Sequence, residues 1–163
     1  MPIWTDPNLS KSALVRALHE WWTSHCRPCG LPDRSDFDLP AHRLLLPNIL
    51  IAEVEEAPFR IRFRLVGTKI VANLGVDFTG RYLEELLAPS YSIPWVDYYR
   101  TAYTDRRPVM GAVTDPTASG RTFDYEFGLF PMTHGGGTTI KQFVSIEDYF
   151  DFELRSGALI GLL

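Results

Sequence analysis

The chain has 163 residues, of which 45% are hydrophobic and 13% are aromatic. This length suits a single domain with a substantial core, and the hydrophobic fraction is too high for a disordered protein. The 16 Lys and Arg residues against 20 Asp and Glu residues give a net charge of −4, which argues against general nucleic-acid binding because that function needs a positive surface. No run approaches about 18 apolar residues, and no basic segment precedes an apolar run at the start of the chain. We therefore expect a cytoplasmic protein with no contact to nucleic acid or membrane.

The first predicted element is a helix over residues 10–25. Its apolar side chains recur at helical spacing and form one stripe, and Asn8 or Ser10 could cap its start. Such a stripe packs on the rest of the chain or on a partner, so we predict that it belongs to an interface. The interface candidates are Leu14, Leu18, Trp21 and Trp22.

The two cysteines form the sequence Cys26-Arg27-Pro28-Cys29 directly after this helix. The pattern resembles a thioredoxin active site, but that chemistry places the first cysteine at a helix N-terminus, where the helix dipole lowers the thiol pKa. Here the pair lies at the C-terminal end of the helix. A structural zinc site needs about four ligands, which His19 and His25 could complete only in an unusual arrangement. We therefore expect two reduced cysteines in a loop, with a thiol redox or zinc protein as the alternative.

The rest of the chain switches between strand and helix patterns. Residues 31–48 are predicted to be a loop with a short helix that Asp38 caps and Pro47 ends. Beyond this loop, apolar residues recur at a period of two in strands and near 3.6 in helices. The predicted strands are residues 49–55, 60–67, 109–113, 121–130 and 138–148, and the predicted helices are residues 68–74, 82–87 and 93–103.

This order of elements predicts an α+β domain in which a five-stranded antiparallel sheet carries helices on one face. We expect an N-terminal helix and linker extension over residues 1–48 and the core over residues 49–150. The remaining residues, 151–163, are rich in apolar side chains and are expected to form a tail that docks on the body or on a partner.

Alternation in the second predicted strand assigns its side chains to two faces. Phe63 and Leu65 are predicted to point inward, toward the helices. Arg60, Arg62 and Arg64 are predicted to point outward, where they are solvated or paired with carboxylates.

In the last predicted strand, Gln142 shares a face with Ile140 and Val144, so we expect its amide to point inward. A buried amide left without hydrogen bonds costs about 1–3 kcal/mol, so a ligand or a tyrosine hydroxyl would have to pair with it. Alternation places the acidic side chains on the opposite side. These outward acids are Asp124, Glu126 and Glu147.

The order of the elements resembles that of the PAS fold, and five sequence pieces in order narrow the resemblance. Over roughly residues 14–147 they are similar to a bacterial family of small, single-domain PAS-like proteins, long described as a domain of unknown function. The chain departs from that family at Leu39, where the family tends to have proline. The pieces are the helix with Trp21 and Trp22, Leu31-Pro32-Asp33-Arg34-Ser35-Asp36-Phe37-Asp38, Leu46-Pro47, Arg64-Leu65-Val66-Gly67-Thr68, and Gly75-Val76-Asp77-Phe78-Thr79-Gly80-Arg81.

The resemblance implies a sensory or regulatory module that signals through ligand-dependent or constitutive protein–protein contacts, as a homodimer or with a signalling partner. It implies no set of catalytic residues. PAS domains hold ligands between the inner sheet face and the longer central helix, although the same aromatic side chains would also simply fill a core. The pocket candidates are Phe63, Leu65, Trp95, Tyr98, Tyr99, Phe123, Tyr125, Phe127, Ile140, Gln142 and Val144.

The sequence disfavours three cofactors that PAS domains use. A haem needs an axial ligand such as histidine, and the central helix over residues 93–103 has none. A flavin adduct or a thioester-linked chromophore needs a cysteine near the central helices, and both cysteines lie far upstream. We expect an unmodified small organic ligand or none.

We expect the chain not to be an enzyme. The alternative is a small α+β enzyme of the isomerase or hydratase type, and that chemistry needs an inward acid with a raised pKa. The alternation described above provides no such acid beside Gln142.

Overall fold

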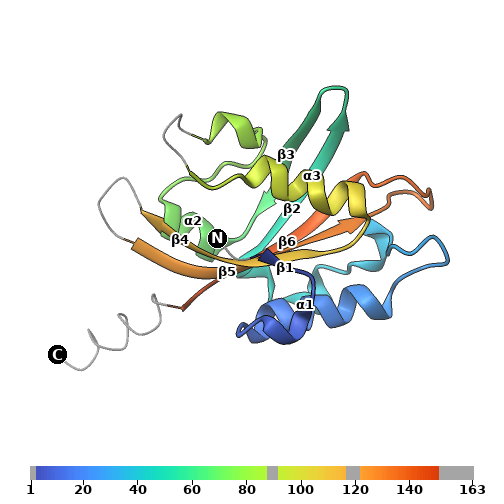
Figure 1. The fold of residues 1–163 in the computed structure, drawn as a ribbon, viewed down its shortest axis with the longest axis horizontal. Helices are drawn as coiled ribbons and strands as arrows, with labels where there is room; N and C mark the ends of the chain where they lie inside the picture. Colours follow the sequence, from blue (N-terminus) through green and yellow to red (C-terminus); the bar gives the residue numbers. More distant parts are fainter. Residues whose placement is uncertain (1–2, 88–91, 117–121, 151–163) are drawn as a thin grey trace.

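A six-stranded antiparallel sheet forms the centre of the molecule (Figure 1). The computed structural model describes residues 3–87, 92–116 and 122–150, and the predicted tail over residues 151–163 lies outside them. The strand order is β1-β4-β5-β6-β2-β3, so the last strand pairs with the first long one in the middle of the sheet. The strands are β1 (Ile3–Trp4), β2 (Ile49–Glu56), β3 (Phe59–Val66), β4 (Val109–Pro116), β5 (Thr122–Met132) and β6 (Gln142–Tyr149).

The five long strands confirm the predicted sheet, and β1 is an addition to it. β1 pairs antiparallel with the edge of β4, with Ile3 opposite Gly111 and Trp4 opposite Met110. A two-residue strand is too short to show a period of two, so only its pairing with β4 defines it. β6 begins at Gln142 rather than at residue 138, because the residues before it still belong to the connection from β5.

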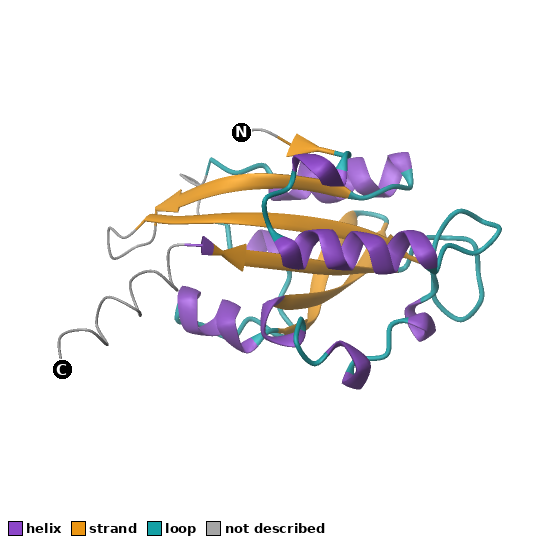
Figure 2. Ribbon diagram, turned by 90° about the horizontal axis from the view of Figure 1, so that it is seen from below, coloured by secondary structure: helices purple, strands orange, loops and turns teal. Residues whose placement is uncertain are grey.

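Helices cover both faces of the sheet. α3 (Trp95–Asp105) lies on one face, the inner face, and α1 (Ala13–Ser24) lies on the other, the outer face (Figure 1). Figure 2, seen from the side of α1, shows α1 crossing in front of the strands. α2 (Thr68–Leu74) has the predicted bounds and ends at Gly75, whose φ of +75° is the left-handed conformation that closes a helix.

The start of α1 differs from the prediction. Ser12 is the capping residue, because its hydroxyl accepts a hydrogen bond from the Val15 amide at 3.0 Å. Among the described residues, no helix combines the length and the apolar character that crossing a bilayer requires. The shorter helical turns are η1 (Pro7–Leu9), η2 (Arg34–Asp36), η3 (Pro40–His42), η4 (Leu46–Asn48) and η5 (Leu83–Glu85).

The apolar stripe of α1 packs against the chain's own sheet. Leu18, Trp21 and Trp22 are buried, with exposed fractions of 0%, 7% and 8%. The Trp22 indole also donates a hydrogen bond to the Pro131 carbonyl of β5 at 2.8 Å. Leu14 is partly buried at the edge of this contact. The stripe therefore forms an intramolecular interface, and these tryptophans are not available to a second subunit in this fold.

A β-bulge reverses the predicted orientation of Leu65. The register of β2 against β3 shifts between Ile51 and Ala52, so Ala52 lies opposite Phe63 while Ile51 lies opposite Leu65. Ile51 is also opposite Val144 of β6, on the outer face. Directly opposite residues share a face, so Leu65 belongs to the outer side and the prediction that it points inward was wrong.

The faces of β6 are also reversed relative to the prediction. Tyr99 of α3 contacts both Phe143 and Ser145, which places these residues on the inner face. Gln142 and Val144 alternate with them and lie on the outer face. The inward orientation predicted for Gln142 was therefore wrong. Because α3 covers one side of β6 and α1 the other, both sides are apolar and alternation alone cannot show which side is inner.

The linker between α1 and β2 is fastened to the turn after β5 by one buried carboxylate. Asp33 is 1% exposed and accepts hydrogen bonds from the Thr133 hydroxyl and the Gly136 amide, both at 2.9 Å, and from the Ser35 amide at 3.1 Å. Burial by itself would raise the pKa of Asp33, but these hydrogen bonds hold it well below its ordinary value. The Leu-Pro-x-Arg-x-Asp element thus joins the N-terminal extension to the core.

Candidate functional site

The candidate site is the layer of aromatic side chains between α3 and the inner face of the sheet. α3 buries Trp95, Tyr98, Tyr99 and Ala102, which lie on one side of the helix at the spacing i, i+3, i+4 and i+7. Each of the three aromatic residues is at most 8% exposed. Helical periodicity in the sequence therefore predicted which side of α3 is buried.

Phe127 of β5 is the centre of the aromatic layer. Its ring meets the Trp95 ring edge-on, with centroids 4.7 Å apart, and stacks on the Tyr98 ring at 5.6 Å and 16°. Trp95 also stacks on Tyr125, the next inward residue of β5, at 6.5 Å and 15°. Edge-on and offset stacked pairs are favourable ring arrangements beyond the burial of their surface, so these rings hold α3 on the sheet.

A second layer of polar aromatic contacts extends from β5 to β6. Tyr125 stacks on Tyr149 with centroids 4.6 Å apart. The Tyr149 hydroxyl donates a hydrogen bond to the Glu147 carboxylate. Glu147 and Tyr149 were not among the predicted site residues, and Glu147 was predicted to point outward. The alternation of side chains along β6 would have indicated both Glu147 and Tyr149, but only contacts with α3 show which side of β6 is the inner one.

A buried hydroxyl pair joins α3 to β6. The Tyr99 and Ser145 hydroxyl oxygens are 3.1 Å apart, and both residues are buried. Burial raises the pKa of Tyr99 far above its ordinary value, the Ser145 hydrogen bond lowers it, and the nearby charge of Glu147 raises it further. Burial also raises the pKa of Tyr98. Both shifts favour the neutral form of the tyrosine hydroxyls.

The structure brings five of the eleven predicted pocket residues together under α3. Phe63 lies on the inner face but contacts Phe78, with ring centroids 4.8 Å apart. Ile140 precedes β6, and the side chain of Phe123 lies outside the described part of the chain. The residues that meet under α3 are Trp95, Tyr98, Tyr99, Tyr125 and Phe127, and those on the outer face are Leu65, Gln142 and Val144.

Some shielded polar atoms within the described residues have no hydrogen-bond partner. They include the side-chain oxygen of Gln142 and both amide atoms of Asn73 on α2. Gln142 was expected to find a partner in a ligand or a tyrosine beneath α3, and its place on the outer face excludes that pairing. Glu147 lies on the inner face, whereas Gln142 lies on the outer face, directly opposite Glu53 of β2 and away from the aromatic layer.

The residues at hand do not fit a flavin–cysteine adduct or a haem held from α3. Both cysteines follow α1, which covers the outer face, so no thiol of this chain lies under α3. His19 lies in α1, and His42 stacks on Phe37 in the linker. α3 itself contains no histidine.

Comparison with known proteins places this geometry in a family. The family model described as a PAS domain matches residues 10–146. No curated protein matches the chain significantly.

Three solved light-oxygen-voltage (LOV) domain structures share the fold. The dark structure of the blue-light photoreceptor Aureochrome1 LOV has a TM-score of 0.51 at 18% identity and covers 69% of this chain and 81% of its own. A light-oxygen-voltage domain studied with a flavin analogue has a TM-score of 0.53 at 13% identity, with coverage of 76% and 91%. An RNA-binding light-oxygen-voltage receptor has a TM-score of 0.53 at 22% identity, with coverage of 81% and 41%. By its family match and its fold, the chain belongs to the PAS domain family.

Proposed function

We propose that this PAS domain is a small regulatory module that signals through protein–protein contacts and forms a homodimer. The observation that carries the proposal is a charged surface on the outer side of the β2–β3 hairpin. α1 packs on β5 and β6 rather than over this surface.

The surface has an acidic row next to a basic row. Glu53 and Glu55 lie on β2, directly opposite Arg62 and Arg60 on β3. Arg64 follows on the same side and forms an ion pair with Glu53 at 2.7 Å. The side chains of Arg64 and Glu53 remain 45% and 33% exposed, so both can contact a partner as well as each other.

Tyr82 orders the basic row. The Arg60 guanidinium lies 3.5 Å from the centroid of the Tyr82 ring, and that of Arg62 lies 5.7 Å from it. The Tyr82 hydroxyl donates a hydrogen bond to Glu55 at 2.7 Å. A preordered row of charges loses less side-chain entropy when it meets a complementary row.

Charge complementarity favours a second copy of this chain as the occupant. A twofold axis through the hairpin surface places the acidic row of each copy over the basic row of the other. Exposed ion pairs contribute little individually, so we expect a weak, salt-sensitive dimer.

Charge reversal with mixing tests this dimer by light scattering after size exclusion. Glu53→Arg with Glu55→Arg makes the surface basic, and Arg60→Glu with Arg64→Glu makes it acidic. We expect each double variant to be monomeric and their equimolar mixture to dimerise, which also shows that both are folded. The matched control, Asp97→Arg with Arg107→Glu at exposed sites on and after α3, should dimerise as the wild type does.

Two results would overturn this proposal. A strict monomer at high protein concentration and low salt would contradict the homodimer. A dimer that persists in both separate variants would contradict the hairpin surface.

We further propose that a small organic ligand, where one is bound, contacts the aromatic layer under α3. Trp95, Tyr98, Tyr125 and Phe127 offer it ring faces, and Glu147 and Tyr149 offer polar groups on the same side. Native mass spectrometry of the protein purified from its own host tests this directly. A bound mass that is lost in Phe127→Ala but kept in the outer-face variant Gln142→Leu would support the location, and the reverse pattern would contradict it.

A further inference from the structure

The Cys26-Arg27-Pro28-Cys29 segment has no part in the function proposed above, yet its two thiols lie at one tight turn. The Gly30 amide donates to the Arg27 carbonyl at 2.8 Å, and the Arg27 amide donates to the Leu31 carbonyl at 3.1 Å. The Cys26 Sγ lies 3.5 Å from the Gly30 carbonyl oxygen, and Gly30 directly follows Cys29. Both thiols are free, with Cys26 exposed and Cys29 half-buried.

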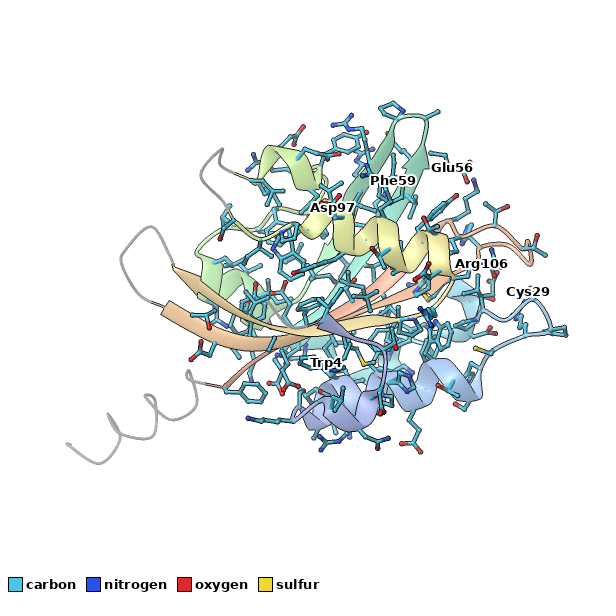
Figure 3. The ribbon with its side chains drawn as sticks, viewed as in Figure 1. Trp4, Cys29, Glu56, Phe59, Asp97 and Arg106 are labelled. Atoms are coloured by element: carbon cyan, nitrogen blue, oxygen red, sulfur yellow. The ribbon has the colours of Figure 1, made fainter. Side chains whose placement is uncertain are left out.

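The side chain of Arg106 connects this turn to the end of α3. The Arg106 guanidinium donates to the Cys29 carbonyl at 3.3 Å and to the Thr138 carbonyl at 2.9 Å. Figure 3 shows Cys29 and Arg106 at the same end of the molecule, beside the last turn of α3. Arg106 has a φ of 55°, a conformation that a non-glycine residue rarely adopts, so its side-chain contacts help to fix the end of α3.

We propose that Cys26 and Cys29 form a reversible disulfide when the protein meets a low-molecular-weight disulfide, and that Arg106 relays this change to the end of α3. The exposed Cys26 thiolate attacks one sulfur of the small disulfide, forms a mixed disulfide and releases one small thiolate. The Cys29 thiolate then attacks the Cys26 sulfur, forms the intramolecular bond and releases the second thiolate. Two electrons pass from the protein to the small disulfide, and the two protons of the protein thiols end on the released thiols.

The environment of the pair suits slow sensing rather than rapid catalysis. Burial raises the pKa of Cys26, and the neighbouring Cys29 raises it further. The turn also follows the C-terminus of α1, where the helix dipole disfavours a thiolate. Strong thiol oxidants owe their strength to a stabilised thiolate in the reduced form, and that stabilisation is missing here. A disulfide at this turn therefore forms slowly. Once formed, its reduction is not favoured by a stabilised thiolate.

Incubation of the folded chain with oxidised glutathione, followed by intact-mass analysis, tests the first part. We expect the mass to fall by two hydrogens, both thiols to become unreactive, and dithiothreitol to restore them. Cys29→Ser should instead retain one glutathionyl group on Cys26, because it lacks the second thiol. A native chain that keeps both thiols, under conditions in which the chain in denaturant oxidises, would overturn the proposal.

Hydrogen exchange tests the second part. The disulfide fixes the turn that carries the Cys29 carbonyl, so we expect exchange at residues 103–107 to slow in the oxidised wild type. Arg106→Gln should still form the disulfide but lose this response. A disulfide that leaves exchange at residues 103–107 unchanged in the wild type would overturn the relay. None of these outcomes depends on the oligomeric state, so failure here leaves the dimer proposal untouched.

Discussion

Neighbouring residues of β5 show how differently the two faces of the sheet are held. Phe127 points inward and packs against the Trp95 and Tyr98 rings. Glu126 points outward, is 4% exposed, and accepts hydrogen bonds from the Lys11 amide at 3.0 Å and the Ser12 amide at 2.9 Å. Many rings share the inner contact, whereas two carboxylates, Glu126 and Asp148, hold the start of α1. The inner face should therefore tolerate changes among apolar residues, and the start of α1 on the outer face should depend on these charged groups.

The largest expected loss of stability follows from a change on the inner face. Phe127→Ala removes the central ring and leaves a cavity between α3 and β5, which should lower the free energy of unfolding by about 4 kcal/mol. Urea denaturation followed by tryptophan fluorescence and by circular dichroism measures it. Phe127→Leu is the control and should lose much less, since it keeps most of the apolar volume. A loss as small as that of Phe127→Leu would show that Phe127 is not the centre of the layer.

The next effect is on the outer face. Glu126→Ala leaves the Lys11 and Ser12 amides and the Ser10 hydroxyl without their acceptor, which should lower the free energy of unfolding by about 2–3 kcal/mol. Glu126→Gln keeps an acceptor oxygen and should recover part of this loss. Hydrogen exchange should rise at residues 10–15 and stay low in α3. Equal increases in exchange on both faces would contradict the conclusion that different contacts hold the two faces.

A smaller effect is expected where the inner face does have a polar contact. Tyr99→Phe removes the hydroxyl beside Ser145 but keeps the ring against Phe143, so the free energy of unfolding should fall by about 1 kcal/mol. The double variant with Ser145→Ala should recover part of the loss, because no buried hydroxyl is then left unpaired. Additive losses in the double variant would show that the two hydroxyls act independently.

The last prediction concerns pH. Burial lowers the pKa of both His19 and His42, and their neighbours Asp6 and Asp38 partly oppose this, while His25 lowers the pKa of His42 further. The unfolded chain therefore binds protons more readily, so the histidine contribution to stability is complete above about pH 6.5 and is lost as the pH falls below it.

Urea midpoints measured from pH 7.5 to pH 5 check this. We expect the midpoint to fall toward acid in the wild type and to fall less in His42→Phe, which keeps a ring against Phe37. An unchanged pH dependence in His42→Phe would assign the effect to other groups.

The sequence located the elements well because each has a local cause. Gly75 ends α2 through a left-handed conformation, and the period of α3 marked its buried residues before any contact was known. The order of strands and helices was enough to indicate the PAS fold. The outward orientation of Glu126 was also predicted, because it alternates with the inward Tyr125 and Phe127.

The errors come from features that are not local. Leu65 lies on the face opposite to the predicted one because a bulge shifts the register of β3 against β2. No nearby residue in the sequence indicates this bulge. The first turn of α1 was placed too early because Asp148 and Glu126, more than a hundred residues away, bind Ser12 and make it the cap. Tyr149 and Glu147 were missed because the two sides of β6 were exchanged.

The amino-acid sequence by itself determined the periods, the breaks between elements and therefore the family of folds. Only the tertiary structure decided which side of β6 meets α3 and which residues complete the aromatic layer. It also decided that α1 packs against the sheet of its own chain. The physical reason is that alternation has a period but no direction. When helices bury both faces of a strand, only contacts between distant segments, such as Tyr99 with Ser145, distinguish the inner side from the outer one.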